Sequence, residues 1–241
     1  MSTPQSQILV IVHQKTSSSG AIGHVLREMG YHLDIRCPAA GGRLPVDLSH
    51  HEGVIIFGGF MSANDEEQYD FVRQELDWIP VALDSQKPFL GVCLGAQMLA
   101  KVLGGRVTKH SQGMAEIGFF PIAPAPGQDV PLFQHSRYVY HWHREGIALP
   151  ASAVLLATGD TFPTQAFRWG DRAYGVQFHP EMNHELMLTW LEKAADMLSL
   201  PGAQSREEQL SKQKYFDEAH QWLHHFLPFW LGRSSSHLIV K

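Results

Sequence analysis

Cysteine is scarce in this sequence of 241 residues, which holds only Cys37 and Cys93. Two thiols cannot build the disulfide framework of a small secreted domain, and they cannot supply the four ligands of a cysteine-only zinc site. We therefore expect both thiols to be reduced, which favours a cytoplasmic protein.

Charged residues are also few, at 18% of the chain. The 19 lysines and arginines are outnumbered by 24 aspartates and glutamates, so the formal net charge is -5. Without a basic excess there is no electrostatic footprint for a polyanion, and we predict no nucleic-acid partner. The 15 histidines are scattered and none forms the H-E-x-x-H pattern of a helical metal site, so we predict no metal and no other cofactor.

Long hydrophobic runs are missing as well. The apolar stretches are a few residues long, against about 20 for a helix that crosses a membrane, and the first residues lack the positive region of a signal peptide. We expect no membrane partner. Hydrophobic residues still make up 44% of the chain, which is enough for a packed core, and the length suits one α/β domain with an appendage.

Short apolar runs alternate with amphipathic stretches over the first hundred residues. Continuous apolar runs of this kind are typical of parallel strands that are covered on both faces. The alternation predicts an open, doubly wound, mostly parallel α/β sheet with right-handed crossovers. The expected strands are 8–12, 32–37, 53–57 and 87–92, and the expected helices are 21–29, 66–79 (ended by Pro80) and 96–103.

The pattern changes beyond residue 105. Short alternating runs up to about residue 175 predict antiparallel strands that are added to the main sheet. A last apolar strand at 173–178 then precedes a helix that Asn183 is expected to cap.

The C-terminal part of the sequence has a helical pattern. The letters SREE at 205–208 predict a capping box, and helical spacing of apolar residues follows until Pro228 interrupts it. We assign residues 1–200 to the main domain and residues 201–241 to a helical C-terminal extension.

The most informative segment is residues 91–97, GVCLGAQ, between an expected strand and an expected helix. It has the G-x-nucleophile-x-G layout of a nucleophile elbow, with Cys93 in the nucleophile position. Gly91 and Gly95 leave room for the sharp turn, and a helix N-terminus favours thiolate over thiol. We therefore predict that Cys93 is a nucleophile rather than a small buried apolar side chain.

A cysteine nucleophile needs a base and a group that orients the base. His179 follows the last apolar strand, so it should lie at the carboxyl edge of the sheet, where open α/β sheets hold their sites. Glu181, two residues on, can reach the far nitrogen of the imidazole and stabilise the imidazolium. We predict that His179 is the acid and base and that Glu181 orients it.

Together these segments resemble the class I, or triad, glutamine amidotransferase family over residues 7–198. The resemblance is carried by GVCLGAQ at 91–97 and FHPE at 178–181, with FGG at 57–59 as a weaker third element. It implies that glutamine is hydrolysed to glutamate and ammonia through a γ-glutamyl thioester on Cys93. It also implies an oxyanion hole made by the backbone N–H groups of Gly59 and Leu94, with Gln97 near the bound glutamine.

Two further segments are similar to the stand-alone branch related to the amidotransferase portion of GMP synthase. They are EIG at 116–118 and HWHRE at 141–145. We assign no catalytic role to His141 or His143. Both should share one face of a strand, and this leaves open whether they lie at the pocket rim or in the core.

The sequence lacks the G-x-x-x-x-G-K-[ST] phosphate loop and the SGGxDS run of the ATP-using half of GMP synthase. Ammonia would therefore pass to an unknown acceptor or to a separate synthase subunit. The helical extension could cover the sheet, contact such a partner or form a homodimer.

Two other functions stay open at this point. A γ-glutamyl peptidase would use the same triad on γ-glutamyl compounds larger than glutamine. A catalytically silent regulatory or redox-sensing protein would keep the fold and use Cys93 for oxidation or for contact with a partner, because a fold does not by itself establish a function.

Overall fold

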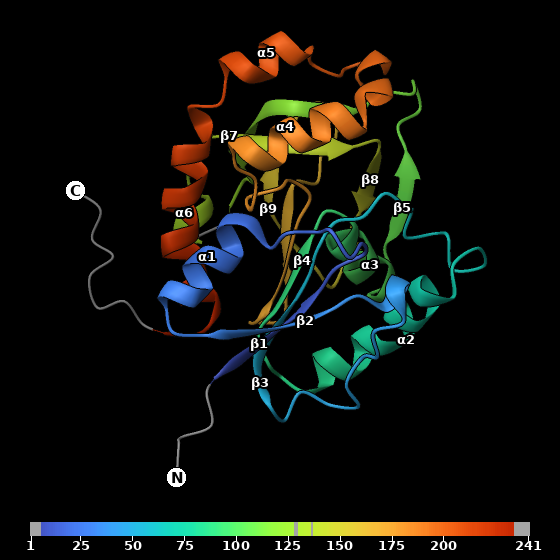
Figure 1. The fold of residues 1–241 in the computed structure, drawn as a ribbon, viewed down its shortest axis with the longest axis vertical. Coiled ribbons are helices and arrows are strands. Elements are labelled where there is room, and N and C mark those ends of the chain that lie inside the picture. The colour runs from blue at the N-terminus through green and yellow to red at the C-terminus, as the bar shows by residue number, and fades with distance from the viewer. Residues whose placement is uncertain (1–5, 128–129, 136, 234–241) are drawn as a thin grey trace.

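A mixed sheet is the centre of the fold (Figure 1). The computed structural model describes residues 6–127, 130–135 and 137–233, and within them one sheet holds nine strands. Its parallel strands, in sheet order, are β2 (His32–Arg36), β1 (Gln7–Ile11), β3 (His51–Ile56), β4 (Phe89–Val92) and β11 (Ala173–Val176). Antiparallel strands continue it as β10 (Ala166–Trp169), β9 (Val154–Thr158), β6 (Glu116–Pro124) and β7 (Arg137–His143). β5 (Arg106–Lys109) and β8 (Glu145–Ala148) form a separate antiparallel pair.

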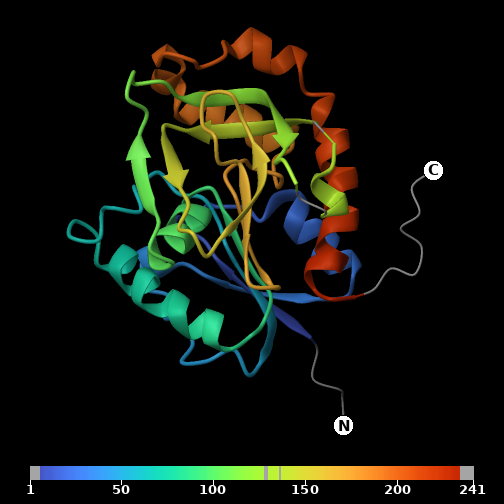
Figure 2. The same ribbon diagram turned by 180° about the vertical axis from the view of Figure 1, so that it is seen from behind.

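This topology confirms the predicted fold class, an open α/β sheet with a parallel core and added antiparallel strands. Figure 2 shows the antiparallel strands, in green to gold, extending from the parallel core toward the C-terminal helices. The carboxyl ends of β3, β4 and β11 lie next to one another because these strands are neighbours and parallel. Loops that follow these three strands therefore meet at one edge of the sheet.

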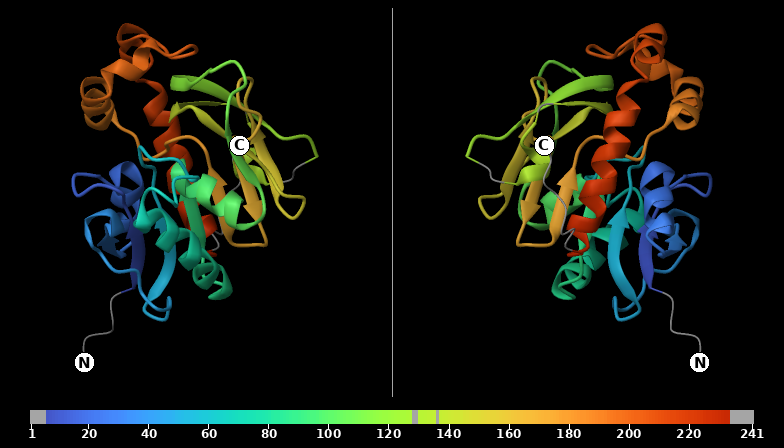
Figure 3. Two further views of the ribbon diagram at one scale, coloured as in Figure 1. Left: turned by 90° about the vertical axis from the view of Figure 1, so that its right-hand side faces the viewer. Right: turned by 90° about the vertical axis from the view of Figure 1, so that its left-hand side faces the viewer.

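Helices cover both faces of the parallel core (Figure 3). Side chains of a strand alternate between the two faces, so Ile8 and Val10 of β1 enter one apolar cluster and Leu9 and Ile11 enter the other. The first cluster includes residues of α1 (Gly20–Glu28) and α6 (Tyr215–Trp230), and the second includes residues of α2 (Asp70–Asp84) and α3 (Leu94–Val102).

The remaining helices pack against the antiparallel strands. A third apolar cluster joins Met187 and Leu191 of α4 (His184–Lys193) to Phe119 of β6 and Tyr140 of β7. The short elements are α5 (Arg206–Ser211) and the 3-10 turns η1 (Pro38–Ala40), η2 (Pro131–Phe133) and η3 (Ala195–Ser199). Among the described helices, none is both long and apolar enough to cross a membrane.

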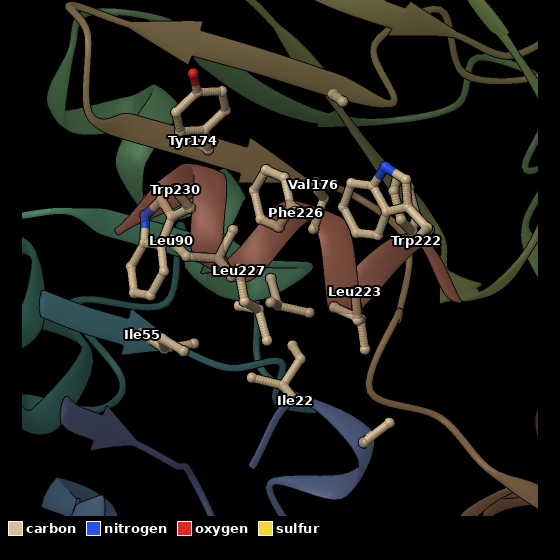
Figure 4. Packing of buried hydrophobic residues seen from close by; sticks show 14 of the residues in the cluster. Ile22, Ile55, Leu90, Tyr174, Val176, Trp222, Leu223, Phe226, Leu227 and Trp230 are labelled. Atoms are coloured by element: carbon tan, nitrogen blue, oxygen red, sulfur yellow. The ribbon is translucent and has the colours of Figure 1, made fainter. Parts of the chain in front are cut away.

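Helix α6, in the predicted C-terminal extension, packs on the same sheet face as α1 (Figure 4). Leu223 and Leu227 point toward Ile22 and Ile55, and both leucines are fully buried. The other buried members of α6 in this cluster are Trp222, Phe226 and Trp230. The division of the chain at residue 200 stays a prediction, but α6 is part of the main apolar core.

Pro80 does not end a helix, and this part of the sequence prediction is wrong. The predicted helix 66–79 is instead α2, which starts at Asp70 and continues through Pro80. Proline removes one backbone donor and disfavours a helix interior. Ile79 and Ala82, on either side of it, are fully buried, and their burial offsets the lost hydrogen bond.

Pro228 is likewise inside a helix rather than an interruption. α6 continues through it to Trp230, and Leu227 and Trp230 are buried on either side. The carbonyl oxygen of Pro228 still accepts a hydrogen bond from the backbone N–H of Arg233, at 2.9 Å. Packing of the apolar face again outweighs the local preference of proline.

The predicted helix starts in the C-terminal part are confirmed. Oδ1 of Asn183 accepts from the backbone N–H of Leu186 at 2.9 Å, which caps α4. Ser205 and Glu208 form the reciprocal capping box of α5, with backbone-to-side-chain distances of 3.2 and 3.0 Å.

We expect Phe226→Ala to lower the free energy of unfolding by about 3–5 kcal/mol, because it leaves a cavity in the main core. Phe229→Ala is the matched control on the same helix, since Phe229 is 39% exposed, and it should cost less than about 1 kcal/mol. Urea unfolding of both variants measures the difference. Equal losses would show that α6 does not stabilise the sheet in the way its burial indicates.

Candidate active site

Cys93 occupies the turn between β4 and α3. Its φ of 49° and ψ of -103° are values that non-glycine residues rarely adopt. A Cβ added to Gly91 would lie 2.5 Å from the carbonyl carbon of Gly95, and one added to Gly95 would lie 2.1 Å from the carbonyl oxygen of Ile56. Only glycine fits at these two positions. The sharp strand-to-helix turn expected from the sequence is therefore present.

The side chain of His179 lies between those of Cys93 and Glu181. It interacts electrostatically with Cys93, and its Nδ1 is 2.8 Å from Oε1 of Glu181. Because a carboxylate only accepts, Nδ1 carries a proton and the other ring nitrogen is left to face the sulfur. All three residues are buried, with exposures of 3–5%. The edge-on ring of Trp190, 4.8 Å away between centroids, holds the imidazole in place.

Two opposing effects act on the charge of His179. Burial disfavours the imidazolium, but the carboxylate of Glu181 and the sulfur of Cys93 favour it more strongly, and together they raise the pKa of His179 to about 10. The imidazole is therefore protonated at neutral pH. Such a group stabilises a neighbouring thiolate and can hand its proton to a departing amine.

The loop after β3 brings two glycines to this pair of side chains. A Cβ added to Gly58 would lie 2.8 Å from Cε1 of His179 and 3.4 Å from Cβ of Cys93. A Cβ added to Gly59 would lie 2.9 Å from Cδ2 of Leu94, the first residue of α3. The N–H of Leu94 has no intrahelical acceptor, as at every helix start. The structure thus brings Gly59 and Leu94 together beside Cys93, and their role as an oxyanion hole stays a prediction.

Gln97 lies one turn into α3 and is buried. Its Nε2 donates to the carbonyl oxygen of Glu145 and to Oε1 of Gln177, both at 3.2 Å. The predicted contact of Gln97 with glutamine stays a prediction. In this structure its amide connects the start of α3 to β8 and to the chain just after β11.

His141 and His143 are core residues rather than rim residues, with exposures of 0 and 5%. Oε2 of Glu116 is 3.1 Å from Nε2 of His143 and 3.4 Å from Nδ1 of His141, and it accepts a hydrogen bond from Gln165 at 2.7 Å. Burial alone would raise the pKa of Glu116, but the hydrogen bond with His143, the electrostatic attraction of His141 and His143, and the hydrogen bond from Gln165 outweigh it and lower this pKa to about 2. Burial lowers the pKa of His141 to about 3.

The same three side chains have the donors of a transition-metal site, two imidazole nitrogens and a carboxylate oxygen within 4.8 Å of one another. The separations of His143 from Glu116 and from His141, 3.1 and 3.2 Å, are also ordinary hydrogen-bond distances, so hydrogen bonding accounts for the cluster without a metal. The prediction of no metal therefore stays a prediction that metal analysis can test.

The sequence prediction missed a buried pair, His13 and Glu75. Nε2 of His13 is 3.0 Å from Oε2 of Glu75, its Nδ1 is 3.0 Å from the carbonyl oxygen of Gly58, and both side chains have zero exposure. Burial opposes the charge on His13, yet Glu75 and the Gly58 carbonyl raise its pKa. The sequence did contain a signal: Glu75 is a charged residue in the inward stripe of α2, in register with Val72 and Ile79.

A cysteine at a strand-to-helix turn, with a buried His–Glu pair on an open α/β sheet, is the layout of α/β proteins that have a nucleophile elbow. The family described as glutamine amidotransferase class-I matches residues 10–195. The chain belongs to the class I glutamine amidotransferase family. Stand-alone proteins and GMP synthases are both among its relatives.

Individual relatives agree with this placement. The chain is 30% identical to YfeJ of Salmonella typhimurium, described as glutamine amidotransferase-like, over 73% of this chain and 75% of that protein. It is 28% identical to gamma-glutamyl peptidase 5 of Arabidopsis thaliana, over 63% of this chain and 62% of that protein. The crystal structure of a glutamine amidotransferase from Thermotoga maritima has a TM-score of 0.85 and 29% identity, and the match covers 94% of this chain and 98% of that one.

The raised pKa of His179 predicts how stability depends on pH. The folded-state pKa of about 10 lies above the value of about 6.5 for an unfolded histidine, so the contribution is complete below pH 6.5 and is lost as pH rises toward 10. Over this range we expect the free energy of unfolding to fall more for wild type than for His179→Gln, which cannot take the proton. His24→Gln changes a side chain that is 73% exposed and should keep the wild-type slope. Equal slopes for wild type and His179→Gln in urea unfolding would contradict the assignment.

Metal analysis of the purified protein tests the cluster of Glu116, His141 and His143. We expect no stoichiometric transition metal, and we expect a chelator to leave the melting temperature unchanged. One equivalent of bound metal that is lost in Glu116→Gln would overturn this prediction.

Proposed function

We propose that the protein hydrolyses the γ-glutamyl amide bond of glutamine through a thioester on Cys93. The observation that carries the proposal is the contact of Cys93, at a strained strand-to-helix turn, with a His179 imidazole whose other nitrogen is bonded to Glu181. Membership of the class I glutamine amidotransferase family supports glutamine as the substrate.

The first step forms the thioester. The thiolate of Cys93 attacks the γ-carbonyl carbon, and the carbonyl oxygen becomes an oxyanion between the N–H groups of Gly59 and Leu94. These donors cost no reorganisation at the moment of reaction, because the turn and the helix start already hold them. Removal of one such donor typically costs about 3–4 kcal/mol of activation free energy.

The second step releases ammonia and then glutamate. His179 is protonated before the reaction, so it gives its proton to the leaving nitrogen as the C–N bond breaks. The neutral imidazole then takes a proton from water, which attacks the thioester and restores the thiolate. Glu181 keeps the imidazole in one orientation throughout.

Ammonia leaves to an acceptor that this chain does not itself define. A separate synthase subunit is one candidate partner, and the proposed compartment is the cytoplasm, where both cysteines stay reduced. Gln97 lies in the first turn of α3, next to Cys93. In this proposal its amide gives up the hydrogen bonds to Glu145 and Gln177 and contacts the bound glutamine instead.

A γ-glutamyl peptidase is the second candidate function, with a larger group on the amine side of the substrate. The similarity to gamma-glutamyl peptidase 5 favours it. So does a cavity of about 600 Å³ beside the Gly58–Gly59 loop, whose lining includes the aromatic rings of Phe60, Tyr69 and Phe71. Phe60 is 65% exposed, so its ring is available to a ligand.

Turnover of glutamine tests the proposal directly. We expect Cys93→Ala and His179→Ala each to lower the rate of glutamate release at least about 1,000-fold, because triad members act as a unit. Cys37→Ala removes the other free thiol and should keep the wild-type rate. Ammonia and glutamate are measured together, since hydrolysis releases them in equal amounts.

A panel of donors then separates the candidate functions. Comparable or higher kcat/KM for γ-glutamyl dipeptides than for glutamine would establish the peptidase. If wild type releases no more glutamate from any donor than Cys93→Ala does, the enzymatic proposal is wrong. Reversible oxidation of Cys93 by peroxide, without labelling by a glutamine-analogue electrophile, would then support the redox-sensing alternative.

A further inference from the structure

The buried pair of His13 and Glu75 touches the active-site loop at one atom. Nδ1 of His13 is 3.0 Å from the carbonyl oxygen of Gly58. That carbonyl belongs to the same peptide unit as the N–H of Gly59, the group that the proposed function needs as an oxyanion donor. The contact of His13 with the Gly58 carbonyl therefore also fixes the direction of the Gly59 N–H.

The geometry of a peptide makes this link rigid. No cis peptide occurs among the described residues, so the C=O of Gly58 and the N–H of Gly59 point in opposite directions within one plane. Two successive glycines have wide conformational freedom, and without a restraint this plane could rotate. His13 restrains it from the side opposite to the N–H.

His13 is itself held firmly. It follows β1, whereas Glu75 lies on α2, and the two side chains meet at 3.0 Å with no exposure to solvent. Both partners of the imidazole, a carboxylate and a carbonyl oxygen, are acceptors only, so both ring nitrogens donate. A charge-assisted hydrogen bond of this kind is stronger and more directional than one between neutral groups.

The other side of the loop is free to bind. Among the residues that the structure describes, no protein acceptor contacts the N–H of Gly59. A Cβ added to Gly59 would meet Cβ of His13 at 3.1 Å and Cδ2 of Leu94 at 2.9 Å, so the loop is wedged between β1 and the start of α3.

We propose that His13 and Glu75 are positioning residues that set the Gly58–Gly59 peptide plane and thereby aim the N–H of Gly59 at the oxyanion. This inference rests on the proposed function. It assigns a second His–Glu pair to the site, on the face of the loop away from Cys93. His13 touches no reacting atom and acts only through the peptide.

Two substitutions at one position separate positioning from general stability. The amide nitrogen in His13→Asn can take the place of Nδ1 and still donate to Gly58, but it loses Glu75. The longer side chain in His13→Gln reaches toward Glu75 and loses Gly58. A role limited to stability predicts similar effects from both, because each removes half of the buried pair.

We expect kcat for glutamine hydrolysis to fall about 100-fold in His13→Gln, the loss typical of one missing oxyanion donor, with a much smaller fall in His13→Asn. KM should change little in either, because the oxyanion exists only after attack. Alkylation of Cys93 by iodoacetamide passes through no oxyanion, so its rate should stay at the wild-type value. Rates are expressed per alkylatable Cys93, which corrects for misfolded protein.

Equal kcat in His13→Gln and His13→Asn, or a loss that appears only in KM, would overturn the inference while leaving the proposed function intact. If wild type itself hydrolyses no γ-glutamyl donor, the proposed function fails instead. The crystal structure of His13→Gln then decides the positioning role without turnover: a rotated Gly58–Gly59 peptide supports it, and an unchanged peptide contradicts it.

Discussion

The rest of the site depends on the close approach of helix α3 to the ends of β3 and β4. The backbone of Gly95 lies so near the carbonyl oxygen of Ile56 that no side chain fits between them. This contact forces the chain into a sharp turn, and Cys93 takes up the turn with a positive φ. The buried strands on either side keep Cys93 in this strained conformation. The turn places its sulfur at the sheet edge, at the start of a helix.

Two buried His–Glu pairs flank this turn, and they differ in how they are built. His179 and Glu181 are two residues apart in one loop, so the chain brings them together locally. His13 and Glu75 are 62 residues apart, on a strand end and on a helix, and they meet only when α2 packs against the sheet. An ion pair taken out of water loses hydration, and hydrogen bonds to further groups offset part of that loss. His13 makes such a bond to the Gly58 carbonyl, and His179 interacts with Cys93, whereas Oε1 of Glu75 and Oε2 of Glu181 are buried without a hydrogen-bond partner among the described residues.

The arrangement of the polar core follows from a parallel sheet whose strands end at one edge. β3, β4 and β11 deliver the glycine loop, the cysteine turn and the His179–Glu181 loop to neighbouring positions. Glu116 and His143 of the antiparallel strands form a buried contact, and the carbonyl of Glu145 joins His143 to Gln97 of α3. The side chains of Glu116, His143, Gln97 and Gln177 are thereby held in few orientations by a buried hydrogen-bonded network that includes the first turn of α3.

Local patterns in the sequence were enough for much of this description. Apolar runs gave the parallel strands, Asn183 and Ser205 gave two helix starts, and the GVCLGAQ and FHPE motifs gave Cys93, His179 and Glu181. The errors occur where packing outweighs a local preference, as at Pro80 and Pro228, each of which has buried neighbours on both sides. Sequence alone determined the strand-to-helix turn and the local His179–Glu181 pair, because each depends on residues a few positions apart. Only the tertiary structure decided that α6 joins the main core and that Glu75 reaches His13, because those contacts connect distant segments that come together only when the apolar faces are buried.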